Sequence, residues 1–163
     1  MLSELKEIKK LQKRPDGIFG SFMTRPVSHA VAFAAFKLHL SPNKVSFLSF
    51  IFCAATVPLL YFHHSSYYYL LLCIALWWIG AIFDAADGDL ARWSGQGSSF
   101  GGWFDSYLDR IKEFLIFGIM GYVSWKSFSS EIYLLLGFLS IFSNVMSGWI
   151  SDTKKAFINA RSP

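Results

Sequence analysis

Five aspartates lie within 26 residues, in the segment DAADGDLARWSGQGSSFGGWFDSYLD from Asp84 to Asp109. On a helix that turns about 100° per residue, Asp84 and Asp87 share one face, whereas Asp89 points away and should be solvated. Asp105 and Asp109 are four residues apart and form a stripe on a second helix. Two carboxylates from each helix can therefore converge on one point. Small residues leave room beside it: Gly88, Ala91 and Gly101.

Four convergent carboxylates cannot all stay ionised without cations nearby. Two divalent ions would cancel four negative charges, and ligand sets of oxygen alone favour Mg²⁺ or Mn²⁺ over Zn²⁺. Such ions usually keep open positions for substrate phosphates. Arg92, one turn past the acidic face, has the planar guanidinium that binds a phosphate through two hydrogen bonds. The residues therefore predict a two-metal site that acts on a phosphate.

The elements that must position these acids are apolar. Hydrophobic residues make up 53% of the 163 residues and the mean hydropathy is +0.39, more than a domain of this size can bury. We expect an all-α integral membrane protein, a helical bundle with about four transmembrane helices. Four runs are long enough to cross the hydrocarbon layer: Val45–Phe62, Tyr67–Phe83, Gly101–Trp125 and Ile132–Ile150. The third is unusual because its first half is charged.

Basic residues predict the orientation of these spans. Lysine and arginine collect before the first run, around the acidic segment and in the tail, whereas the two opposite loops contain one lysine, Lys126. The positive-inside rule then makes the protein multi-pass, with its N-terminus and active site in the cytoplasm. The net charge of +4 serves insertion and contact with anionic membrane lipid, so we do not expect nucleic acid as a partner.

Two regions follow from this pattern. Residues 1–40 are expected to form N-terminal interfacial helices, with Val27–Leu40 partly embedded, and residues 41–163 a membrane-embedded domain. A turn at Ser94–Ser99 should separate two helices, and Ser41 with Pro42 should begin another. Cys53 and Cys73 are expected to be buried and inert. We expect interfacial positions for the four histidines, His29 among them, and lipid-interface anchoring for four tryptophans, Trp93 among them.

The spacing of the acidic segment resembles the complete signature of the CDP-alcohol phosphotransferase (CDP-alcohol phosphatidyltransferase) family. Eight positions match across two helices: Asp84, Asp87, Gly88, Ala91, Arg92, Gly101, Asp105 and Asp109. The upstream LSPNKVSFLS is similar to the start of the family's first core helix. The family usually has six membrane helices, and four are expected here. Two explanations for this difference are open: the gene product is shortened, or closure of the site comes from elsewhere, such as a homodimer partner.

The resemblance implies a role for each matching residue. Asp84, Asp87 and Asp105 would bind two Mg²⁺ or Mn²⁺ ions, and Asp109 would take the proton from the attacking hydroxyl and also serve as a metal ligand. Gly88 and Arg92 would contact the CDP moiety. Further contacts to the CDP-linked donor are implied for four residues: Ser98, Pro42, Asn43 and Ser46. Ala91 and Gly101 would be structural members of the motif.

The implied reaction is attack of a polar alcohol acceptor on the phosphate of a CDP-alcohol, such as CDP-diacylglycerol, with CMP leaving, in phospholipid or polyol-phosphate biosynthesis. The segment DGIFGSFMTRPVSHAV resembles transferases that use inositol phosphate, and Arg25 within it would contact the acceptor phosphate. Glycerol phosphate, serine, choline and ethanolamine remain open as acceptors. Two other classes remain open as well: an inactive membrane scaffold that binds nucleotide or lipid, and a transporter that uses intramembrane carboxylates.

Overall fold

The computed structural model describes residues 24–63 and 66–159. Within these ranges the regular elements are helices and no strand occurs, so the all-α prediction is confirmed. The helices are α3 (Arg25–Lys37), α4 (Pro42–Ala54), α5 (Thr56–Tyr61), α6 (Tyr67–Ser94), α7 (Ser99–Phe128) and α8 (Ile132–Asn159). The predicted interfacial helix at the very start of the chain lies outside the described residues.

Three segments in the described part of the chain are long and apolar enough to cross a membrane: Pro42–Tyr61, Tyr67–Ser94 and Ile132–Ser151. They correspond to the first, second and fourth predicted spans. The third predicted span lies in α7, which has 30 residues but carries the charged residues of the acidic segment. The total of four spans therefore stays a prediction.

The first span is less regular than predicted, because the helix breaks at Ala55 between α4 and α5. Pro58 lacks the N–H that would bond to the carbonyl of Ala54. The hydroxyl of Thr56 donates to the carbonyl of Cys53 at 2.6 Å. Cys53 and Cys73 are buried free thiols, as predicted.

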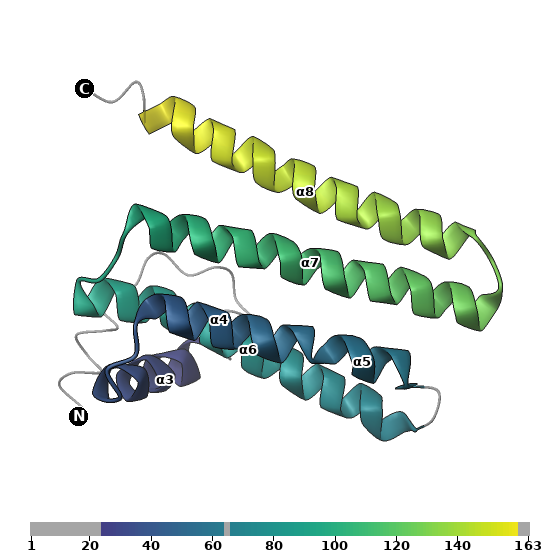
Figure 1. Ribbon diagram of the computed structural model, residues 1–163, viewed down its shortest axis with the longest axis horizontal. Helices are drawn as coiled ribbons and strands as arrows, with labels where there is room; N and C mark the ends of the chain where they lie inside the picture. Colours follow the sequence, from purple (N-terminus) through teal and green to yellow (C-terminus); the bar gives the residue numbers. More distant parts are fainter. Residues whose placement is uncertain (1–23, 64–65, 160–163) are drawn as a thin grey trace.

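The long helices lie side by side, with α7 and α8 as an antiparallel pair and α4–α5 next to α6 (Figure 1). The start of α4, the end of α6 and the start of α7 lie at the same end of the bundle (Figure 1). One short connection, residues 95–98, brings the end of α6 next to the start of α7. Gly95 ends α6 in a left-handed conformation, and the Ser98 side chain caps α7 by accepting a hydrogen bond from Gly101 N at 2.9 Å. The predicted turn at Ser94–Ser99 is thus confirmed.

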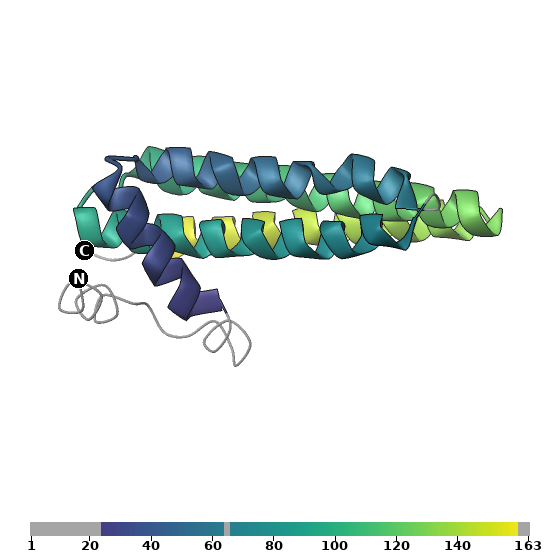
Figure 2. The same ribbon diagram turned by 90° about the horizontal axis from the view of Figure 1, so that it is seen from below.

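Helix α3 crosses the long helices at a steep angle (Figure 2) and packs against α6. Their contact is made by small side chains, Ala32 and Ala35 of α3 and Ala86 of α6, with Val45 and Leu90 beside them. Small residues let the two helix backbones come close. Trp93 lies against Phe36 of α3, with ring centroids 4.3 Å apart. Trp93 is half-buried by this contact, and its role as a lipid-interface anchor stays a prediction.

Candidate active site

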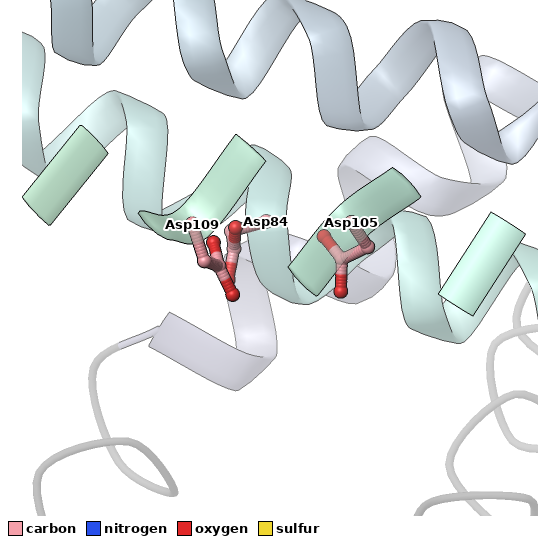
Figure 3. A group of neighbouring side chains, drawn as sticks. All are labelled: Asp84, Asp105 and Asp109. Atoms are coloured by element: carbon pink, nitrogen blue, oxygen red, sulfur yellow. The ribbon is translucent and has the colours of Figure 1, made fainter. Parts of the chain in front are cut away.

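Three of the four predicted metal ligands meet between α6 and α7. Each of Asp84, Asp105 and Asp109 offers a carboxylate oxygen, and these oxygens lie within 4.8 Å of one another. In Figure 3 the carboxylates of Asp84 and Asp109 face each other, and Asp105 lies one turn away on α7. The four-residue spacing puts Asp105 and Asp109 on one face of α7, as predicted. The three side chains are half-buried.

Asp87 lies one turn along α6 from Asp84, outside this group of three. It is 6% exposed and lines a cavity together with Asp105. Within the described residues, Asp87 Oδ2 and Asp105 Oδ1 are buried and have no hydrogen-bond partner. Buried carboxylate oxygens without a donor are costly unless a cation meets them. The donor set therefore fits divalent ions that prefer oxygen ligands.

Lys112 is part of this cluster, although the sequence analysis counted it only among the basic residues that predict orientation and gave it no role in the site. Its Nζ lies 2.5 Å from Asp84 Oδ1, 2.6 Å from Asp109 Oδ1 and 3.4 Å from Ser49 Oγ. Lys112 follows Asp109 by three residues, and residues three apart lie on the same face of a helix, as residues four apart do. That spacing was the signal that could have identified it. Ser49 carried no comparable signal, because it lies on α4 and reaches Asp84 only through the tertiary packing.

Two cavities flank the carboxylates. The first, of about 250 Å³, is lined by Asp84, Asp109, Lys112 and Glu113, with Trp77 and Ser49; we call it the Lys112 cavity. The second, of about 220 Å³, is the Ser98 cavity. It is lined by nine of the residues that the sequence analysis selected: Pro42, Asn43, Ser46, Asp87, Gly88, Ala91, Ser98, Gly101 and Asp105.

Gly101 is needed for the shape of the Ser98 cavity. A Cβ atom at this position would lie 3.0 Å from Asn43 Oδ1 and 3.2 Å from Ser98 Oγ, which is tighter than ordinary contact. The absence of a side chain at Gly101 thus lets the start of α4 approach the start of α7.

The basic residues of the predicted site contact a different acid. Arg92 Nη2 donates to Asp89 Oδ1 at 2.7 Å, and Arg25 Nη1 donates to the same oxygen at 3.2 Å. Asp89 is 2% exposed, so the prediction of a solvated side chain was wrong; it does point away from the metal face, but α3 covers it. His29 is 8% exposed and lies beside Asp89, not at an interface. Glu113 pairs with Arg110 on the same helix, with Oε2 and Nη1 2.7 Å apart.

The amino-acid sequence is similar to those of two named archaeal proteins. Over 141 residues, 86% of this chain, it is 28% identical to the bifunctional IPC transferase and DIPP synthase of Archaeoglobus fulgidus, of which the match covers 26%. Over 50 residues, 29% of this chain, it is 48% identical to the archaetidylinositol phosphate synthase of Pyrococcus horikoshii, of which the match covers 27%. The matched segments thus span about a quarter of these relatives.

The family comparison covers the whole candidate site. The model of the CDP-alcohol phosphatidyltransferase family matches residues 39–160, which is more than half of the chain. This range holds the four signature aspartates and both cavities. The chain belongs to the CDP-alcohol phosphatidyltransferase family.

Proposed function

We propose that this protein transfers a substituted phosphate group from a CDP-alcohol to an alcohol acceptor and releases CMP. One observation carries the proposal: Asp84, Asp105 and Asp109 converge next to a cavity lined by four other signature residues, Asp87, Gly88, Ala91 and Gly101. Membership in the CDP-alcohol phosphatidyltransferase family supports the same reaction. The domain that performs it comprises residues 41–163.

The acidic residues have separate tasks in this proposal. Asp84, Asp87 and Asp105 would hold two Mg²⁺ or Mn²⁺ ions, with Asp109 beside them. When bound, such ions neutralise the charge that develops on the transferred phosphate. Asp109 accepts the proton of the acceptor hydroxyl. The hydroxyl oxygen then forms a bond to phosphorus while the phosphorus bond to the CMP oxygen breaks, so no covalent enzyme intermediate is needed.

The Ser98 cavity is the proposed place of the cytidine diphosphate group. Its walls combine hydroxyl and amide side chains with glycines that let a ligand come close to the backbone. Asp109 faces the other cavity, the Lys112 cavity. The proposed nucleophile therefore approaches from the side opposite to the nucleotide, which suits an in-line displacement.

The names of the relatives point to one class of acceptor. One relative is named an archaetidylinositol phosphate synthase, and we propose a polyol phosphate, with inositol phosphate first, as the acceptor. Arg25 contacts Asp89, and its predicted contact to the acceptor phosphate stays part of the proposal. We further propose a multi-pass protein with cytoplasmic active site and N-terminus, from the lysine and arginine distribution, and a homodimer in the membrane.

Product identification tests the proposal. The protein, embedded in lipid, is incubated with CDP-diacylglycerol or CDP-inositol, Mg²⁺ or Mn²⁺, and separate alcohol acceptors. The acceptors are inositol phosphate, glycerol phosphate, serine, choline and ethanolamine. We expect CMP release that requires the divalent ion, and a product whose mass equals donor plus acceptor minus CMP. Absence of CMP release with every donor, alongside retained nucleotide binding, would favour the scaffold class.

A further inference from the structure

Asp89 is the most completely enclosed acid in the described part of the chain, and the proposed reaction does not use it. Its side chain is 1% exposed, and each of its two carboxylate oxygens has two polar partners within 3.4 Å. Arg25 Nη1 and Arg92 Nη2 donate to Oδ1 at 3.2 and 2.7 Å. Ser28 Oγ donates to Oδ2 at 3.2 Å, and His29 Nε2 lies 3.4 Å from Oδ2. Three of these four partners come from α3.

This arrangement fixes the Arg92 guanidinium in one place. Arg92 follows Gly88 by four residues and Asp89 by three, so its side chain folds back along α6 toward both. A Cβ atom at Gly88 would lie 3.3 Å from Arg92 Nη1 and 3.4 Å from Nη2. The guanidinium therefore lies directly over Gly88, which is a wall residue of the Ser98 cavity.

The two arginines that contact Asp89 differ in how exposed their side chains are. The Arg92 side chain is 35% exposed, whereas that of Arg25 is 11% exposed. Arg92 is thus the more accessible cation of the cluster, and its guanidinium lies next to Gly88, a residue of the cavity wall. A guanidinium held by a carboxylate on one edge still presents further N–H donors to a phosphate.

We propose that Asp89 is a positioning residue, which holds the Arg92 guanidinium over Gly88 so that it binds the diphosphate of the nucleotide donor. Helix α3 takes part by enclosing Asp89 and supplying its other partners. The inference rests on the proposed function, since it assumes a CDP-linked donor in the Ser98 cavity. Asp89 acts through Arg92 and touches no reacting atom.

The test is a double-mutant cycle read out as CDP binding. The full chain is purified in lipid nanodiscs, and the CDP dissociation constant is measured by calorimetry for wild type, Asp89→Asn, Arg92→Gln and the double variant. Because a hydrogen bond between charged groups is at stake, we expect each single change to weaken CDP binding by about tenfold. If Asp89 acts through Arg92, the double variant binds within about twofold of the weaker single variant.

Ser28→Ala is the matched control for the integrity of the cluster. It removes one hydrogen bond to Asp89 Oδ2 and leaves the pair between Asp89 and Arg92 in place. We expect CDP affinity within about twofold of wild type, because the guanidinium stays aligned. An equal loss in Ser28→Ala and Asp89→Asn would overturn the inference, as would losses that multiply in the double variant.

A second variant keeps the test decisive if Asp89→Asn does not fold. Asp89→Glu retains the charge and shifts the carboxylate by one methylene, and the cycle with Arg92→Gln is repeated. Non-additive losses support the inference and independent losses overturn it. If Asp89→Asn binds CDP as tightly as the wild-type protein does, only the role of Asp89 is refuted. A wild-type protein that binds no CDP would refute the proposed donor, and this inference with it.

Discussion

The ammonium group of Lys112 lies 2.5 Å from Asp84 Oδ1, across the interface between α7 and α6. The same Nζ lies 2.6 Å from Asp109 Oδ1, so one lysine joins two of the three clustered carboxylates. A divalent ion bound by Asp84 and Asp109 would lie close to the ammonium group that contacts both carboxylates. We therefore predict that Lys112 and the ion compete for these carboxylates.

The Lys112→Met variant tests this competition. It keeps much of the aliphatic length and removes the ammonium, so we expect Mn²⁺ affinity to rise by about tenfold, which corresponds to about 1.4 kcal/mol. Without metal, the variant should be less stable than wild type, by about 1 kcal/mol, because two carboxylates lose their partner. The loss is small because both carboxylate side chains are more than a third exposed. Calorimetric Mn²⁺ titration and thermal unfolding give the two quantities.

Lys112→Arg serves as the control for charge at this position. It retains the positive charge near Asp84 and Asp109, and we expect its Mn²⁺ affinity to stay closer to wild type than that of Lys112→Met. Equal or weaker Mn²⁺ binding in Lys112→Met than in wild type would contradict the competition, and would instead make the ammonium a support for the ligand geometry.

Asp109→Asn separates the proposed base from the binding residues. The amide cannot accept the hydroxyl proton, so we expect turnover to fall at least about a hundredfold. CDP affinity should change little, because the Ser98 cavity is lined by other residues. Initial rates of CMP release and CDP calorimetry measure the two effects. Glu113→Gln, one turn further along α7, should lose at least tenfold less activity; comparable losses would argue against Asp109 as the base.

Helical periodicity was sufficient to predict the convergence of Asp84 with Asp105 and Asp109, because it follows from residue spacing on two long helices. It also predicted that Asp89 leaves the metal face. It could not predict what covers the opposite face, which depends on how α3 packs across α6, and Asp89 and His29 were misplaced for that reason. Lys112 was interpreted only as a topology signal, since its contact to Asp84 exists only once two helices are packed.

Trp93→Ala tests the docking of α3 onto α6. Trp93 is half-buried, and its loss removes apolar contact, a tilted ring pair with Phe36 and a stacked ring pair with Phe33. We expect a decrease of about 2 kcal/mol in the free energy of unfolding. Trp103→Ala provides the comparison, because Trp103 is 59% exposed and its removal should cost much less. Thermal unfolding of both variants measures the difference, and an equal loss would show that α3 does not depend on Trp93.

Gly101→Ala tests the close approach of α4 and α7 at the Ser98 cavity. The added methyl group would lie 3.0 Å from Asn43 Oδ1 and 3.2 Å from Ser98 Oγ, so the start of α4 must shift. We expect a loss of about 1–3 kcal/mol in stability, typical of overpacking. Gly102→Ala is the matched control on the same turn, because its Cβ would meet no heavy atom within 4 Å. Since alanine favours a helix over glycine by up to about 1 kcal/mol, Gly102→Ala should be at least as stable as wild type. Thermal unfolding of the two variants decides the matter: equal stability would mean that the contact between Gly101 and Asn43 can relax without cost.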